Sequence, residues 1–263
     1  MLILWNNNEL GCIMLEMLLL GGGVKEVVDG TGPGNNQMLF SYSKGEGLLA
    51  GYFGRVNYTN LLSGEDLAAA IGLTTGTAFN GTVDWLKFHL DGKILFTPQK
   101  PFRYGLTWKS IYDLGAAYGD DTTGDNLPTS VPAVLQNKII AIGPWQFRVR
   151  LMTMINPPPN TGRLSDETEW DRLIYSVMAD QVTGQQITGT AKWDSFTPAD
   201  IGITGTNGIW HYSKSPYYNS SNYTASKGVR GSSSVTNKSA YAYTVTNVAT
   251  GWRPVLELIP PTT

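Results

Sequence analysis

The residues best suited to binding chemistry gather near the end of the chain. Between Thr206 and Gly251 lie six of the 13 tyrosines, together with nine serines and five asparagines. A tyrosine ring offers a large, rigid contact area at a small entropy cost, while serine and asparagine form adaptable hydrogen bonds. This mixture predicts a displayed binding surface, and the alternative is a loop packed on a neighbouring subunit. The candidate binding residues are Trp210, His211, Tyr212, Tyr217, Tyr218, Tyr223, Tyr241 and Tyr243.

The sequence lacks the short motifs that accompany many catalytic sites. It contains no GxSxG, P-loop, HExxH or EF-hand pattern. Its two histidines, His89 and His211, are far apart and no cysteine cluster accompanies them, so a zinc site is not expected. We therefore predict a protein without catalytic residues, bound metal or cofactor. A pair of carboxylates for glycan hydrolysis stays open as an alternative, because their spacing is spatial and not sequential.

One acidic segment keeps a second alternative open. Asp120, Asp121 and Asp125 follow one another closely in GDDTTGD, where their carboxylates and nearby carbonyl groups could hold calcium. The same composition is typical of a solvated turn. The sequence does not decide between the two.

Composition restricts the class of protein. The 263 residues are 41% hydrophobic, 11% aromatic and only 15% charged, which favours a rigid, loop-rich protein with β-structure over a disordered chain. The net charge of −2 and the lack of a Lys/Arg run argue against a nucleic-acid partner. The single cysteine, Cys12, excludes an intrachain disulfide.

The N-terminal segment carries an apolar run from Ile13 to Leu20 that is too short to span a bilayer, so membrane insertion is not expected. The run is either a buried element or a hydrophobic arm that docks on another subunit, with Gly21 to Gly23 as its hinge. The arm would make the protein a homo-oligomer or bind it to a larger assembly.

Several strands and hairpins follow from alternation and turn residues. Alternating apolar residues on both sides of Asp91-Gly92 predict a hairpin from Trp85 to Thr97. A second strand pair is expected around Gly143-Pro144, and two short strands around residues 45–47. The segment from Gly184 to Gly251 shows no helical periodicity and is predicted to be irregular. Trp252 to Leu258 reads as a final, largely buried strand.

Three helices are expected from capping patterns and apolar spacing. Ser63 and Gly72 delimit a short helix over residues 64–71. Thr107 is suited to cap a second short helix. In SDETEWDRLIYSVM, Asp166 is suited to cap a third helix with Glu169 at its third position, and apolar residues recur at spacings of three and four.

The order of these elements resembles the C-type lectin-like fold, in the version found in formylglycine-generating enzymes and phage variable tropism proteins. The motifs that carry the resemblance are Glu169-Trp170 on a helix, Arg230-Gly231-Ser232, and Gly251-Trp252-Arg253 before the last strand. The resemblance covers residues 84–259. The cysteine pair of the enzymes is missing, since Cys12 lies outside this range, and so are the calcium-binding Glu-Pro-Asn and Trp-Asn-Asp triplets of sugar-binding lectins.

The resemblance implies an α+β fold with two helices around twisted antiparallel sheets and long irregular loops. It assigns residues 81–263 to a C-type lectin-like domain and residues 1–80 to an N-terminal attachment or oligomerisation region. Segments such as WLKFHLDGK and GWRPVLEL also resemble phage virion proteins. The expected protein is a non-enzymatic component of a tailed-phage virion, in the tail, baseplate or fibre. Its expected partners are other virion proteins and a host surface glycan or protein. A decoration protein of the capsid or tail is the alternative.

Overall fold

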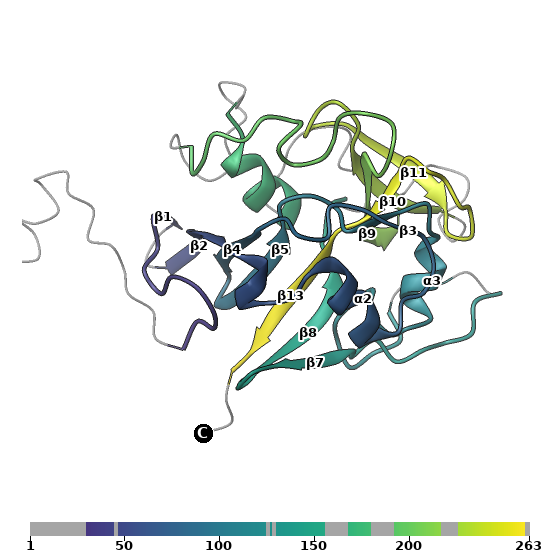
Figure 1. Ribbon diagram of the computed structural model, residues 1–263, viewed down its shortest axis with the longest axis horizontal. Coiled ribbons are helices and arrows are strands. Elements are labelled where there is room, and N and C mark those ends of the chain that lie inside the picture. Colours follow the sequence, from purple (N-terminus) through teal and green to yellow (C-terminus); the bar gives the residue numbers. More distant parts are fainter. Residues whose placement is uncertain are drawn as a thin grey trace, which may run out of the picture.

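The chain forms two β-sheets with few helices, a mixed fold that is mostly β (Figure 1). The computed structural model describes residues 30–44, 47–124, 127, 130–155, 168–179, 192–216 and 226–260. The seven-stranded sheet has the order β1-β2-β4-β5-β13-β8-β7, and the six-stranded sheet has the order β11-β10-β9-β12-β6-β3.

The strands and helices have the following bounds. The seven-stranded sheet contains β1 (Phe40–Lys44), β2 (Gly47–Val56), β4 (Trp85–Leu90), β5 (Lys93–Pro98), β7 (Ile139–Ile142), β8 (Trp145–Leu151) and β13 (Pro254–Ile259). The six-stranded sheet contains β3 (Thr77–Ala78), β6 (Arg103–Tyr104), β9 (Trp210–Pro216), β10 (Ser226–Gly231), β11 (Lys238–Ala242) and β12 (Thr250–Trp252). The helices are η1 (Tyr58–Asn60), α2 (Gly64–Ile71), α3 (Trp108–Tyr112), η2 (Trp170–Ile174) and η3 (Tyr175–Val177).

The predicted hairpins are confirmed. Leu90 pairs with Lys93 across the two-residue turn, in which Asp91 and Gly92 have φ angles of 47° and 80°. Positive φ at both central positions is the requirement of a type I′ turn, which an Asp-Gly pair meets at little cost. The strand pairs β7–β8 and β1–β2 also lie where they were expected.

The two short predicted helices are confirmed with their caps. The Ser63 side chain accepts the backbone N–H of Asp66 at the start of α2, and Gly72 adopts the left-handed conformation at its end. The Thr107 side chain accepts the backbone N–H of Ser110 at the start of α3. Each cap satisfies a donor that the first helical turn leaves unpaired.

The third predicted helix differs from expectation. The described residues that follow Thr168 form one wide π-type turn, η2, which continues as the 3-10 turn η3. The Thr168 hydroxyl accepts the backbone N–H of Asp171 at 3.1 Å, while Asp166 lies outside the described residues. Glu169 makes no capping hydrogen bond, because its carboxylate is bound to Arg150.

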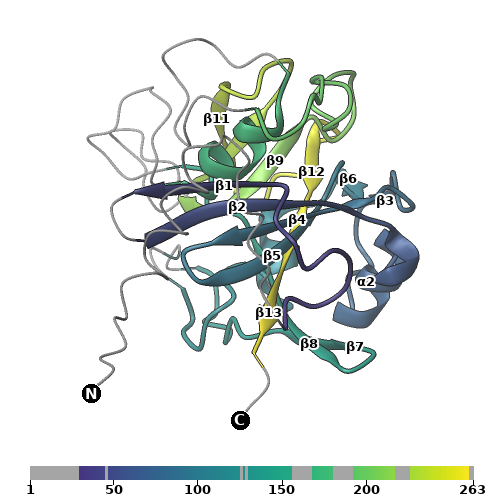
Figure 2. The same ribbon diagram turned by 90° about the vertical axis from the view of Figure 1, so that its left-hand side faces the viewer.

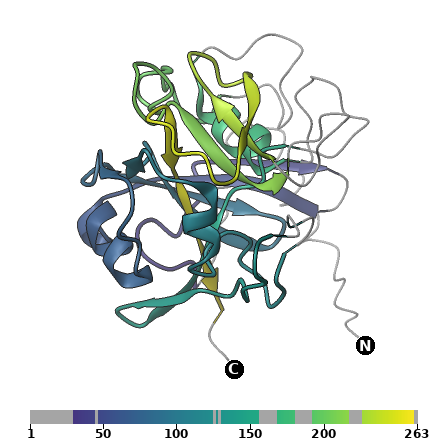
Figure 3. The ribbon, with the colours of Figure 1, turned by 90° about the vertical axis from the view of Figure 1, so that its right-hand side faces the viewer.

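The prediction of an irregular region from Gly184 to Gly251 is confirmed for residues 192–209, which form no helix and no extended strand, but it is wrong for much of the described chain after them. Strands β9, β10, β11 and β12 occupy residues that were expected to be loop, and they form most of the six-stranded sheet. Small polar residues do not prevent a ladder of backbone hydrogen bonds, and glycine permits close approach. A Cβ added at Gly228 would lie 2.4 Å from the Ile155 side chain. Figure 3 shows these green and yellow strands together on one side of the molecule.

The last segment of the chain belongs to both sheets. β12 lies in the six-stranded sheet, and after Arg253 the chain continues as β13 in the seven-stranded sheet. There β13 lies between β8, with which it pairs from Pro254 to Ile259, and β5. The expectation of a buried final strand is confirmed, since Trp252 and Leu256 have exposed fractions of 0%. Figure 2 shows this segment running from one sheet to the other.

The described part of the predicted attachment region shares the sheet and the core of the rest of the chain. β2 pairs with β4 along most of its length. Leu67 and Ile71 of α2 lie in the same hydrophobic cluster as Trp108 and Trp252. The boundary predicted near residue 80 therefore falls between parts that pack together. Residues 1–29, including Cys12 and the apolar run, lie outside the described residues.

A buried lysine attaches the first described residues to the sheet. The Lys87 ammonium on β4 donates to the Thr31 hydroxyl at 2.9 Å and approaches the carbonyl oxygens of Gly32, Pro33 and Asn35 at 3.4, 3.0 and 2.7 Å. It also lies 4.9 Å from the centre of the Phe53 ring. One charged group thereby fixes a segment that has little regular structure.

We expect Lys87→Met to lower the free energy of unfolding by about 1.5–3 kcal/mol, because one buried and three partly buried acceptors lose a charged donor. Cleavage within residues 30–39 in limited proteolysis should become faster than cleavage elsewhere. Lys138→Met, at a half-buried lysine directly before the edge strand β7, is the control. Equal protease sensitivity in both variants would contradict this role of Lys87.

Candidate functional site

The structure divides the predicted binding residues into three groups. His211 and Tyr212 are buried, and Trp210, Tyr241 and Tyr243 are half-buried. Tyr217, Tyr218 and Tyr223 lie outside the described residues.

The expectation that His211 and Tyr212 are displayed on a loop is wrong. Both lie on β9 and have exposed fractions of 0%. β9 is flanked by β10 and β12, and successive side chains of a strand point to opposite faces of the sheet. Tyr212 therefore enters the hydrophobic cluster that contains Trp108, while His211 lies edge-on to Trp170, with ring centres 5.4 Å apart. Both faces of β9 are covered, so neither residue reaches solvent.

The remaining three aromatic residues form a half-exposed group that we call the aromatic edge: Trp210, Tyr241 and Tyr243. The rings of Trp210 and Tyr241 lie 6.5 Å apart and are tilted by 60°. The Tyr243 hydroxyl lies 2.8 Å from that of Ser130. All three rings pack on the core with part of their surface. β11 is an edge strand, so the aromatic edge combines accessible rings with an open strand edge.

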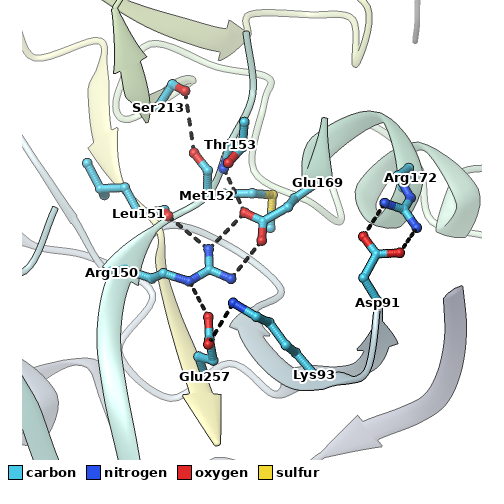
Figure 4. A network of polar contacts seen from close by, with 10 residues as sticks. All are labelled: Asp91, Lys93, Arg150, Leu151, Met152, Thr153, Glu169, Arg172, Ser213 and Glu257. Carbon is cyan, nitrogen blue, oxygen red and sulfur yellow. Dashed lines mark hydrogen bonds and ion pairs between the residues drawn. The ribbon is translucent and has the colours of Figure 1, made fainter. Parts of the chain in front are cut away.

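A network of buried charges lies on the other sheet, and Figure 4 shows it. Arg150 on β8 donates to both carboxylate oxygens of Glu169, at 2.8 and 2.6 Å, and to Glu257 on β13 at 2.8 Å. Lys93 on β5 pairs with the second oxygen of Glu257 at 2.9 Å. The backbone N–H of Thr153 donates to Glu169 at 2.7 Å. The network joins three neighbouring strands to the segment that leads into η2.

A second ion pair connects the same helix to the first hairpin. Arg172 binds both carboxylate oxygens of Asp91 at 2.6 and 2.7 Å, as Figure 4 shows. Asp91 is the residue that opens the turn between β4 and β5. The hairpin is thereby attached to η2 as well as to its neighbouring strands.

The carboxylates of the network stay ionised at neutral pH. Burial raises the pKa of Glu169, but the charge and hydrogen bonds of Arg150 outweigh it, so that the pKa falls below its usual value. The pKa of Glu257 is lowered in the same way, against the effect of burial, by Arg150 and Lys93. A general acid at neutral pH needs a raised pKa. These two carboxylates are therefore suited to cross-linking the fold and not to proton transfer.

Sequence reasoning missed this network, because its members are far apart along the chain. Arg150 is 19 residues from Glu169 and 107 residues from Glu257. The one signal in the sequence was that β8 and β13 each carry charged residues between apolar residues that were expected to be buried. A buried charge in a strand normally requires a partner, but only the fold identifies which one.

A second buried group contains one residue from each of the three motifs on which the family resemblance rests. We call it the Trp170 cluster: Trp170, Asp171, His211, Arg230 and Arg253. Arg230 pairs with Asp171 at 2.5 Å. The Trp170 indole and Arg230 both donate to the carbonyl oxygen of Val235, at 2.8 and 3.3 Å. The Arg253 guanidinium lies 5.7 Å from the centre of the Trp170 ring.

The acidic segment from Gly119 does not assemble a metal site in its described part. No group of three or more potential metal ligands occurs among the described residues. One Asp120 carboxylate oxygen accepts the backbone N–H and the hydroxyl of Thr122, and Asp121 lies 3.7 Å from Arg148. Asp125 lies outside the described residues. The described part forms a hydrogen-bonded turn, while calcium binding stays an untested alternative.

No family model, no curated protein and no solved structure matches the chain. None of the helices in the described ranges combines the length and the apolar character needed to cross a bilayer.

Proposed function

We propose that the chain folds as a C-type lectin-like domain and serves as a non-enzymatic structural protein of a tailed-phage virion. The observation that carries the proposal is the Trp170 cluster. Glu169-Trp170, Arg230-Gly231 and Gly251-Trp252-Arg253 are far apart along the sequence, yet Trp170, Arg230 and Arg253 contact one another or a shared carbonyl group. Motifs that define one fold are expected to converge in this way.

The aromatic edge supports binding as the function of this domain. Trp210 on β9, Tyr241 on β11 and Tyr243 just after β11 all pack on the core, and their exposed parts are thereby preorganised, which lowers the entropy cost of binding. As a tail, baseplate or fibre component, the protein would use this surface to recognise a glycan or protein of the host. Tyr217, Tyr218 and Tyr223 belong to the same proposed surface.

Apolar residues at other edges favour the second candidate, a decoration protein of the capsid or tail. Phe40 on β1 and Ile139 on β7 are 38% and 46% exposed, and these strands form the two edges of the seven-stranded sheet. Leu39 and Leu135 are 42% and 51% exposed. Exposed apolar residues at open strand edges are suited to contacts with neighbouring virion subunits or further copies of this chain.

Adsorption separates the two candidates. Labelled protein is incubated with host cells and with particles assembled without this chain. Saturable binding to cells supports host recognition, and saturable binding to the deficient particles alone supports decoration. Binding to neither would contradict both, and turnover of host polysaccharide that single carboxylate substitutions abolish would support a glycan-processing enzyme.

We expect Tyr241→Ala to weaken binding to the cells or particles more than about tenfold, since an aromatic residue at the centre of an interface contributes about 2 kcal/mol or more. The measurement is the equilibrium binding constant, together with the melting temperature of each variant. Tyr58→Ala is the matched control, because Tyr58 is also half-buried and packs on the core. Unchanged affinity with a large loss of stability would assign Tyr241 to the core alone.

A further inference from the structure

The Trp170 cluster contains more buried positive charge than its described acidic residues neutralise. Arg230 and Arg253 have exposed fractions of 3% and 0%, and the cluster holds one carboxylate, Asp171, which is bound to Arg230. Lys238 adds a further cation that interacts with Arg230 and Asp171. A buried charge without a partner of opposite sign is costly.

Arg253 is the member without a carboxylate. Its Nη2 group donates to the carbonyl oxygens of Gln99 and Ile201, and its charge lies over the Trp170 ring. Its Nε and Nη1 atoms are buried and have no hydrogen-bond partner in the described part of the chain. Burial lowers the pKa of Arg253 to about 9, the expected effect on a charge that two neutral carbonyls and one ring compensate only in part.

Further unpartnered nitrogens lie on the neighbouring strands. Arg230 is opposite His211 in the β10–β9 pair, and His211 is opposite Gly251 in the β9–β12 pair, two residues before Arg253. The buried Arg230 Nε has no hydrogen-bond partner in the described part of the chain. The two ring nitrogens of His211 are buried and make no hydrogen bond of normal geometry there, although the backbone of Gly202 and Gly208 lies near enough to act on the imidazole. The His211 ring centre and the Arg253 guanidinium lie 5.4 and 5.7 Å from the Trp170 ring centre, so these groups gather around one aromatic residue.

His211 is a neutral member of this group. Burial, and next the charge of Arg253, hold the pKa of His211 well below its usual range, although the backbone of Gly202 and Gly208 acts in the opposite direction. A neutral imidazole carries one N–H donor. His211 therefore adds no further positive charge, but it can donate one hydrogen bond alongside the two guanidinium groups.

We propose that a small monovalent anion of the size of chloride binds inside the Trp170 cluster, between Arg253 and His211. It would accept hydrogen bonds from the Nε and Nη1 atoms of Arg253 and supply the negative charge that the cluster lacks. Arg230 Nε and the His211 N–H are further donors for it. Ordered water would satisfy the hydrogen bonds but not the charge, and this difference makes the proposal testable.

The test compares chloride with gluconate, an anion too large for a buried site of this kind, at constant ionic strength. We expect the unfolding equilibrium constant of the wild-type protein to fall about tenfold for each tenfold rise in free chloride above the dissociation constant. Crystals grown in bromide should show an anomalous peak between Arg253 and His211. Arg253→Met should remove the chloride dependence, and Arg55→Met, at a half-exposed arginine paired with Asp194, should retain it.

Support requires both wild-type measurements, so the proposal is tested even if the Arg253→Met protein does not fold. Equal stability in chloride and gluconate, or no bromide peak at this position, would overturn the proposal in favour of water. Chloride dependence that persists in a folded Arg253→Met protein would place the anion elsewhere and overturn it as well. The proposal is independent of the proposed virion function, because both measurements use the isolated protein without cells or particles.

Discussion

Arg150→Met is expected to lower the free energy of unfolding at neutral pH by about 3–5 kcal/mol, the usual cost of removing one member of a buried ion pair. Arg150 is 2% exposed and binds both Glu169 and Glu257. The substitution leaves two largely buried carboxylates with much less positive charge beside them. Urea denaturation at constant temperature measures the change.

The pH dependence of this variant should have the opposite sign from that of the wild-type protein. In the wild type the pKa values of Glu169 and Glu257 are lowered in the folded state, so their contribution is present above about pH 4.3, the usual unfolded value, and is lost as pH falls through the folded pKa values. Without Arg150, burial raises both pKa values. The variant should then gain stability as pH falls from 7 towards 4.3.

Lys93→Met is the control for Arg150. Lys93 also pairs with Glu257, but its side chain is 56% exposed, and an exposed ion pair contributes less than about 1 kcal/mol. We expect Lys93→Met to lose little stability and to become less stable as pH falls, as the wild-type protein does. If Arg150→Met loses no more stability than Lys93→Met, the network is not a cross-link of the fold.

Trp252→Ala should lower the free energy of unfolding by about 3–5 kcal/mol, because the deletion empties a large aromatic site that cannot fully collapse. Trp252 is 0% exposed, and its ring lies 6.4 Å from that of Phe102. Val248→Ala, at a residue that is 60% exposed, should change stability by no more than about 0.5 kcal/mol.

Truncation after Gly251 tests whether the fold requires the whole last strand and not only the Trp252 side chain. It removes Arg253 and all of β13, so that β5 and β8 lose the strand between them. The remaining chain should fail to fold from about Trp85 onward. Pulse proteolysis of the truncated protein measures this, and a resistant core from residues 85 to 251 would contradict the central role of the last strand.

The sequence by itself determined those elements whose signals are local. The type I′ turn at Asp91-Gly92, the caps at Ser63, Thr107 and Gly72, and the hairpin at Gly143-Pro144 involve residues within a few positions of one another. Backbone conformational preferences and short-range hydrogen bonds decide such features, and both can be read along the chain. The alternating apolar residues likewise predicted the burial of the last strand.

Tertiary structure decided where the polar residues of the C-terminal part lie. The same composition of tyrosine, serine and asparagine suits a loop or a strand, so the sequence placed His211 and Tyr212 on an exposed surface, whereas pairing with β10 and β12 buries them. The fold leaves Trp210, Tyr241 and Tyr243 half-buried, with part of each ring accessible.

The partners of Arg150 and the surroundings of Arg253 were also beyond the sequence. The energy of a buried charge depends on groups brought within a few ångströms by chain segments that are up to 154 residues apart, as Gln99 and Arg253 are. Sequence shows that a charge will need compensation when it is buried. Only the packing of strands against η2 determines whether a carboxylate, a ring or a bound ion provides it.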